Sequence, residues 1–212
     1  MFKYNKFFEV PYGPHVKMVQ LVGNNKKVLE VGCATGYISE KLKENGCKVV
    51  GIEIDKKAGK LAKKFCKDVI ISDVESLKNI PYKKNYFDVI LFGDVLEHLK
   101  NPLNVLKNLR RYLKNNGYIV ISVPNIAFWL IRLRLFFGKF DYKDYGIMDK
   151  THLRFFTFKT VKELLKDAGY KISRIDIAPR CISPLIDWFI YRITKLWKSL
   201  LAYQFLIVAI KR

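Results

Sequence analysis

The chain reads Val28-Leu29-Glu30-Val31-Gly32-Cys33-Ala34-Thr35-Gly36 where an apolar run meets a glycine-rich turn. A strand, a turn of small residues and a following helix bind nucleotides, because glycine permits the tight turn and lets backbone approach a ligand closely. The turn lacks the Gly-x-Gly-x-x-Gly spacing of dinucleotide-binding folds. Glu30 would repel a pyrophosphate and suits a positively charged ligand. The stretch therefore predicts a cofactor that is cationic at one end.

Apolar strands alternate with amphipathic helices along the rest of the chain. The predicted strands are 27–31, 48–53, 68–71, 87–92, 118–123, 170–177 and 204–210. The predicted helices are 36–45, 56–67, 101–114, 159–168 and 184–200. This alternation predicts an α/β fold with a mostly parallel, doubly wound sheet. We assign residues 1–24 to an N-terminal arm and 25–212 to one domain, in which the aromatic and basic segment 125–157 is a helical insertion on the substrate side.

Acidic residues follow the second and third predicted strands. Glu53 lies about 20 residues after Gly32, the spacing at which a carboxylate accepts hydrogen bonds from ribose hydroxyls. Asp55 is a weaker rival for this role, and Asp73 after the third strand could accept a hydrogen bond from the exocyclic amine of adenine. Ligands of open α/β sheets bind at the carboxyl ends of the strands. The three acids and the turn therefore predict one site at this edge.

The pattern Glu30-x-Gly32-x-x-x-Gly36, with Glu53 and Asp73, resembles the class I S-adenosylmethionine (SAM)-dependent methyltransferases. Segment 87–99 resembles their fourth strand and following loop, and its Val-Leu-Glu-His form is similar to the branch that includes ubiquinone-biosynthesis O-methyltransferases. The likeness covers residues 25–210, and Ala34 stands where many members have glycine. It implies a Rossmann-like seven-stranded sheet whose last strand is antiparallel.

The resemblance also implies SAM as the methyl donor and S-adenosylhomocysteine as the product. The methionine part would be surrounded by Glu30, Gly32 and Gly36, the ribose held by Glu53, the adenine by Asp73 and Val74, and the sulfonium would lie beside Gly93 and Asp94. Cys33, Ala34 and Ile54 complete the predicted cofactor-binding set.

The acceptor is less well defined. Segments 122–125, 138–142 and 146–157 resemble methyltransferases that accompany sugar-transfer and cell-surface polysaccharide enzymes, which points to a small-molecule, glycan or lipid-linked acceptor. A hydroxyl acceptor would benefit from a general base, and His98 and His152 are the candidates. His98 could instead cap a helix or line the pocket, and His152 could order its loop through Asp149. Transfer could also proceed by proximity alone.

The chain carries 39 Lys and Arg against 19 Asp and Glu, a net charge of +20. This charge favours anionic partners, or it reflects a lysine-rich proteome with the charge spread over solvated faces. RNA or DNA methylation is one alternative function, although no Asn-Pro-Pro-Tyr motif follows the fourth strand. A non-catalytic SAM-binding module is another.

The four cysteines are scattered, with no Cys-x-x-Cys pair, so the sequence predicts neither a disulfide framework nor a metal site. We find no signal peptide and no apolar run of the ~20 residues that span a bilayer. We therefore expect a cytoplasmic protein. Segments 126–137 and 187–198 interleave aromatic and basic residues and could rest at a membrane surface, which would make the protein peripheral.

Overall fold

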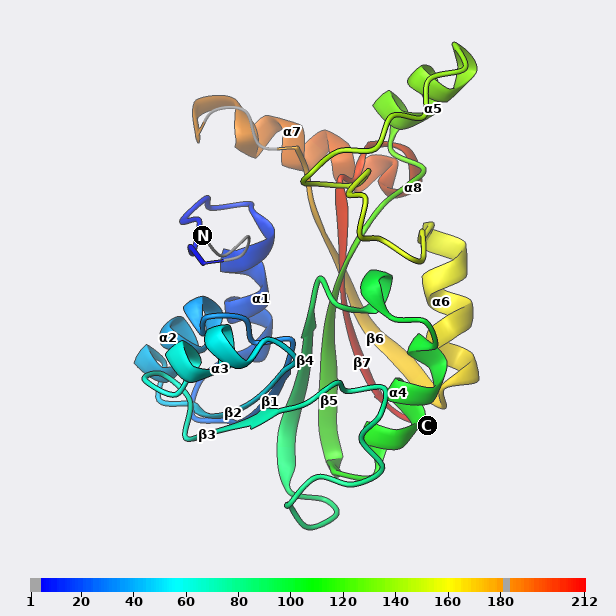
Figure 1. Cartoon of the computed structure of the whole chain (residues 1–212). Coiled ribbons are helices and arrows are strands. Elements are labelled where there is room, and N and C mark those ends of the chain that lie inside the picture. Colours follow the sequence, from blue (N-terminus) through cyan, green and yellow to red (C-terminus); the bar gives the residue numbers. More distant parts are fainter. Residues whose placement is uncertain (1–4, 181–183) are drawn as a thin grey trace.

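The computed structural model describes residues 5–180 and 184–212, and its centre is a seven-stranded sheet with the order β3-β2-β1-β4-β5-β7-β6 (Figure 1). The strands are β1 Lys27–Val31, β2 Lys48–Glu53, β3 Asp68–Ile71, β4 Phe87–Gly93, β5 Leu113–Pro124, β6 Tyr170–Ala178 and β7 Gln204–Lys211. The helices are α1 Pro14–Val22, α2 Tyr37–Glu44, α3 Lys56–Ala62, the 3₁₀ helix η1 Leu96–His98, α4 Pro102–Arg110, α5 Trp129–Phe136, α6 Phe158–Asp167, α7 Pro184–Leu196 and α8 Lys198–Leu201.

Strand direction confirms the predicted topology. β1 pairs in parallel with β2 and β4, and the parallel pairing continues to β3 on one side and β5 on the other. β7 is antiparallel to both β5 and β6. Only the last strand is therefore reversed, as the resemblance implied.

Helices cover both faces of the sheet, because side chains alternate between the faces along each strand. On one face α1, α2 and α3 pack over residues such as Val28 and Val49. On the other face α4 and α6 pack over Leu29 and Ile52. Strands buried on both faces form near-continuous apolar runs, which explains why the sequence located them well.

The segment assigned to an N-terminal arm contains a helix that the sequence analysis did not predict. In α1, Pro14 occupies the first turn, where its missing N–H costs nothing. Met18 and Val22 of this helix are fully buried in the core shared with α2 and α3. The N-terminal segment is thus packed into the domain.

Several predicted helices end earlier than expected. α3 stops at Ala62, because the N–H of Phe65 bonds to the Ala62 carbonyl three residues back and tightens the chain. The predicted helix 184–200 is divided into α7 and α8 at Trp197, whose φ of −136° is not helical. In the insertion only Trp129–Phe136 is helical.

Across residues 5–180 and 184–212, none of the helices combines the length and the apolar character that crossing a bilayer requires.

Candidate functional site

A cavity of about 1000 Å³ opens at the carboxyl ends of the central strands. This is the edge at which open α/β sheets bind ligands, and the volume is sufficient for a nucleoside-sized cofactor and part of an acceptor. Residues that end four strands line it: Val31 and Gly32 after β1, Glu53 and Ile54 after β2, Ser72 and Asp73 after β3, and Gly93 and Asp94 of β4.

The glycine-rich turn forms one wall. Gly32 has a φ of 71°, and a Cβ there would lie 2.5 Å from Cγ2 of Val95, so this position requires glycine. Ala34 also has a left-handed φ, 48°, a conformation that favours glycine. The N–H groups of Gly32 and Cys33 both bond to the Ile52 carbonyl, which bends the turn over the end of β2.

Glu53 connects this turn to the next strand. One carboxylate oxygen accepts the N–H of Ala34 at 2.8 Å, and the other accepts the N–H of Asp55 at 2.8 Å. The side chain is buried but lies on the cavity wall. The rival Asp55 is occupied as the N-cap of α3, accepting the N–H groups of Lys57 and Ala58. Both carboxylates line the cavity, Glu53 at the end of β2 and Asp55 at the start of α3.

Asp73 and Val74 line the far end of the cavity with the exposed side chain of Ile54. Asp73 is held by a hydrogen bond from the N–H of Glu75, 2.9 Å from its Oδ1. An apolar side chain beside a fixed carboxylate suits a planar base with an exocyclic amine. These three predicted residues are brought together.

Three predicted cofactor residues do not line the cavity. Glu30 lies behind the turn, where its carboxylate accepts a hydrogen bond from the Ser39 hydroxyl. Burial, followed by the nearby Cys66 and Glu53, raises the pKa of Glu30 well above its ordinary value. The Cys33 thiol is buried, and Gly36 packs closely on α3. Glu30 therefore supports the turn from behind instead of presenting a charge to the cavity.

Asp94 sits at the end of β4 with a left-handed φ of 55°. Its Oδ1 accepts hydrogen bonds from the Ser122 hydroxyl at 2.9 Å and from the Gln204 side chain. Burial raises the pKa of Asp94 to about 6, although these two bonds act in the opposite direction. Asp94 and its neighbour Gly93 line the cavity.

The two candidate bases meet although they are far apart in sequence. The Glu97 carbonyl accepts the N–H groups of Leu153 and Arg154 at 2.8 and 2.9 Å, which fastens the end of the insertion to η1. The rings of His98 and His152 are thereby stacked edge to face, with centroids 4.8 Å apart. His98 lines the cavity, and His152 lies behind it.

Backbone carbonyls fix the tautomer of both rings. Nδ1 of His98 lies 3.1 Å from the Thr151 carbonyl, and Nδ1 of His152 lies 3.1 Å from the Ile147 carbonyl. A carbonyl can only accept, so Nδ1 of each ring carries a proton. Asp149 orders this loop through Thr151, whose N–H and hydroxyl both bond to its Oδ1.

Glu97 is a functional candidate that the sequence analysis missed. Its side chain is 1% exposed, and among the described residues neither carboxylate oxygen has a hydrogen-bond partner. Burial, followed by the nearby Asp94 and Asp149, raises its pKa well above the ordinary value. One ligand atom each of Glu97, His98 and His152 lie within 4.8 Å of one another. A carboxylate with two imidazoles suits a divalent transition metal, whereas the sequence predicted no metal site.

The N-terminal segment also reaches the cavity, which no motif signalled. Phe8 and His15 line it, and Nδ1 of His15 accepts the N–H of Phe8 at 3.1 Å. Burial lowers the pKa of His15 to about 4, so this ring is neutral near pH 7. On the opposite wall Tyr145, Thr151 and Leu153 of the insertion line the cavity.

Comparison with known proteins agrees with this arrangement. Residues 16–175 match a family described as a methyltransferase domain. An uncharacterized protein of Methanocaldococcus jannaschii is 29% identical over 173 residues, which cover 80% of this chain and 78% of that protein. The ubiquinone biosynthesis O-methyltransferase of Nitrosomonas europaea is 30% identical over 113 residues, which cover 48% of this chain and 45% of that enzyme. The chain thus spans less than half the length of this curated relative.

The fold has solved counterparts. A SAM-dependent methyltransferase from Archaeoglobus fulgidus is similar with a TM-score of 0.66 and 23% identity, over 94% of this chain and 95% of that one. The family match covers most of the chain, and the sheet order and the cavity at its carboxyl edge agree with it. The chain therefore belongs to the methyltransferase-domain family and is a class I SAM-dependent methyltransferase.

Proposed function

We propose that this enzyme methylates a hydroxyl oxygen of a small-molecule, glycan or lipid-linked acceptor. SAM supplies an electrophilic methyl group on a sulfonium, so the chain has to position the acceptor and remove its proton. The observation that carries the proposal is His98, whose proton-bearing Nδ1 is fixed by a carbonyl while the residue lines the cavity next to Asp94.

The cofactor half of the proposal rests on the strand ends. Glu53 would hold the ribose hydroxyls, Asp73 with Val74 and Ile54 the adenine, and Gly93 with Asp94 the sulfonium end. The geometry that supports this is the fixed Glu53 carboxylate between two backbone amides and the small residues of the turn. Gly32 and Ala34 leave room for the methionine part, because neither carries a bulky side chain.

The acceptor half rests on η1 and the end of the insertion. We assign general-base catalysis to Nε2 of His98, because the Thr151 carbonyl holds the ring through its other nitrogen and the residue lines the cavity. His152 supports that ring from behind, edge to face. In this arrangement His98 contacts the acceptor, and His152 is a positioning residue.

The unpartnered Glu97 favours a second version of the acceptor site. In this version a divalent cation would be held by Glu97, His98 and His152. The cation would lower the pKa of the bound acceptor hydroxyl and so replace the general base. The hydrogen bonds from Nδ1 to carbonyls are those that commonly orient metal-ligating histidines.

Cobalt(II) binding distinguishes the two versions. A visible absorption band that Glu97→Gln abolishes, and that His15→Gln retains, would support the cation site. His15 is a matched control, because it is a half-buried histidine that lines the same cavity at a different place. No band, together with full activity after chelation, would leave His98 as the base.

The acceptor class is tested by turnover. Cell extract would be separated into lipid, polysaccharide, nucleic-acid and small-molecule fractions, and each would be incubated with the enzyme and SAM labelled in its methyl group. We expect label in the lipid, polysaccharide or small-molecule fraction, and a base-stable ether in the product. Label confined to nucleic acid would contradict the proposal and support the alternative that the +20 charge suggests.

A lipid-linked acceptor is met at a membrane surface, so the proposal includes peripheral membrane association. The aromatic and basic character of the insertion supports it, together with the names of the ubiquinone O-methyltransferases as relatives.

A further inference from the structure

Helix α5 has no buried residue, although most of its side chains are apolar. Phe136 is 82% exposed, and four large apolar neighbours are exposed with it: Trp129, Leu133, Leu135 and Phe137. Leu130, Ile131 and Arg134 are partly covered, and the other five residues of the helix are exposed. Most of its apolar surface therefore faces water. In Figure 1 α5 stands out from the sheet at the upper right, beyond the carboxyl ends of the strands.

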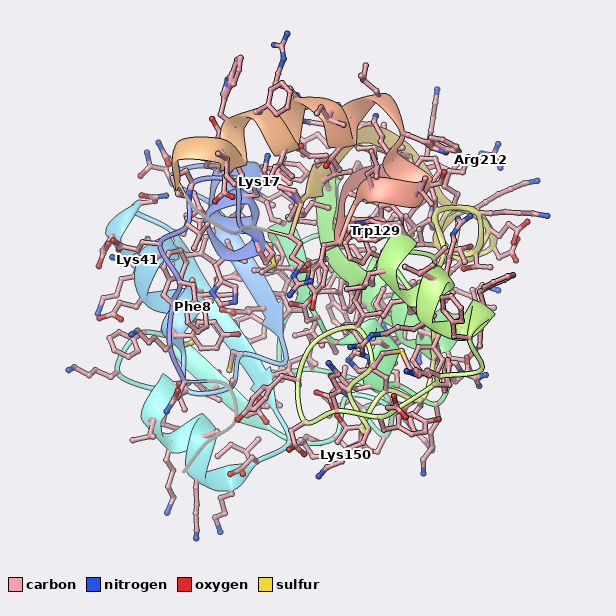
Figure 2. The ribbon with its side chains drawn as sticks, turned by 90° about the horizontal axis from the view of Figure 1, so that it is seen from above. Phe8, Lys17, Lys41, Trp129, Lys150 and Arg212 are labelled. Carbon is pink, nitrogen blue, oxygen red and sulfur yellow. The ribbon has the colours of Figure 1, made fainter. Side chains whose placement is uncertain are left out.

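Helix α7 carries a second set of exposed apolar side chains. Leu196 is 86% exposed, and the others are Ile186, Trp188, Phe189, Ile193 and Trp197. The α7–α8 region is joined to α5: the Arg132 guanidinium bonds to the Ser199 carbonyl at 3.5 Å. Figure 2, which looks down on this end of the molecule, shows Trp129 beside the end of the α7–α8 segment. We call α5, Phe137 and the exposed side of α7 with Trp197 the apolar crown.

The charges on the apolar crown have one sign. Its basic residues are Arg132 and Arg134 on α5 and Arg192 and Lys195 on α7, and Lys198 at the start of α8 adjoins them. Segment 126–140 contains no acid, and the only acid of 184–203 is Asp187, which is 1% exposed. The exposed ionic groups of the crown are therefore all cationic.

We propose that the apolar crown docks on the surface of a membrane that contains anionic lipids. Aliphatic and aromatic side chains would enter the interface, while arginine and lysine remain at the depth of the phosphate groups. A second copy of the chain fits less well, because a symmetric pair would bring cationic crowns together. Nucleic acid fits less well too, because exposed leucines and isoleucines gain little from a phosphate backbone.

This orientation places the cavity near the lipid. The crown lies at the carboxyl end of the sheet, and Tyr145 and Leu153 of the same insertion line the cavity. An acceptor on a lipid carrier would reach His98 from that side, a consequence that rests on the proposed function. The docking itself does not rest on it and can be measured without any acceptor.

The test is sedimentation of the full chain with vesicles, with no SAM and no acceptor present. We compare phosphatidylcholine vesicles with vesicles that also contain phosphatidylglycerol. Leu135→Glu and Leu196→Glu alter the crown, and Leu61→Glu on α3 is the matched control, because Leu61 is 52% and Leu135 56% exposed. All three substitutions change the charge equally, and none removes a buried side chain.

We expect binding to the anionic vesicles that weakens as salt is added, because salt screens exposed charges. Each crown variant should bind about tenfold more weakly, and Leu61→Glu should bind like the unaltered chain. Equal binding by all variants, or equal binding to both vesicle types, would overturn the proposal. The proposal would also be overturned if the chain bound no vesicles and formed a dimer in analytical ultracentrifugation that Leu135→Glu dissociates. Vesicle binding and methyl transfer to a water-soluble acceptor are separate measurements. A failure of the docking proposal would therefore leave the proposed function standing.

Discussion

Two carboxylates of the cavity are held in different ways. Glu53 accepts two backbone amides from different loops, so it fixes the shape of the turn as well as facing the cavity. Asp94 accepts two side-chain donors, and its buried position raises its pKa to about 6. Glu53 therefore fixes the geometry of the site, whereas the carboxyl of Asp94 changes its charge at about pH 6.

Glu53→Ala should weaken SAM binding by about tenfold to a hundredfold. The variant loses the acceptor for the ribose and leaves two backbone amides without their partner, together ~1.5–3 kcal/mol. Isothermal titration calorimetry measures the change. Asp55→Ala is the control: it loses a helix cap worth ~1 kcal/mol of folding free energy and should keep its affinity. The reverse pattern would show that the ribose binds to Asp55.

Asp94 should make cofactor affinity depend on pH. The carboxyl is neutral below pH 6 and ionised above it, and only the ionised form attracts a sulfonium. SAM affinity should therefore rise roughly tenfold as pH increases through about 6. Asp94→Asn keeps a side chain that accepts hydrogen bonds and should show a flat profile in the same calorimetric series. A profile that Asn leaves unchanged would assign the titration to another group.

At the scale of elements, the acceptor side depends on the pairing of η1 with the end of the insertion. The Glu97 carbonyl joins them, and Asp149 holds Thr151, whose carbonyl in turn orients His98. Asp149 is fully buried and is not a cavity residue. If His98 is the base, as proposed, Asp149 acts on catalysis indirectly, through the position of that ring.

Asp149→Ala should lower kcat by about tenfold or more and leave SAM affinity unchanged. The loop loses both hydrogen bonds that order Thr151, and misplacement of a catalytic ring by a fraction of an ångström reduces rate strongly. Thr151→Ser is a useful companion, because it keeps the hydroxyl and should retain activity. A parallel loss of SAM affinity in Asp149→Ala would mean that the loop supports the cofactor instead.

Some elements could be predicted from sequence and others could not. Strands buried on both faces show continuous apolar runs, and β1 and β2 occupy the predicted residues. Helix α1 was missed, although Pro14 and the spacing of Met18, Leu21 and Val22 carry a helical signal. The proximity of Glu97 to His152 left no local signal, because it depends on how the insertion folds back. Nor could the sequence show on which face of the sheet the Glu30 side chain lies.

At the scale of the whole molecule, a buried ion pair joins three distant parts. Nζ of Lys17 on α1 lies 3.1 Å from a carboxylate oxygen of Asp176 on β6, and both side chains are buried. The Tyr191 hydroxyl on α7 donates to the same carboxylate at 2.8 Å. The N-terminal helix, the sheet and the helix of the apolar crown thus share one polar contact.

Lys17→Met should lower the free energy of unfolding by about 3 kcal/mol, because it removes the buried cation of Asp176 and leaves only the exposed Arg174 guanidinium, 3.7 Å from the carboxylate. Chemical denaturation followed by circular dichroism measures this change. Adding Asp176→Asn should recover part of the loss, since the uncompensated charge is then removed. If the double variant were less stable than Lys17→Met, charge burial would not be the cause.

The reversed last strand has a consequence for synthesis on the ribosome. Among the described strands, β6 is paired with β7 alone, and β7 is made after it. A nascent chain that ends before Gln204 therefore leaves β6 unpaired, and it lacks the side chain that donates to Asp94. Chains grow at roughly 5–20 residues per second, so the earlier strands wait for the last one before the sheet closes. We therefore expect a nascent chain that stops before Gln204 to bind the methyl donor more weakly than one that includes β7.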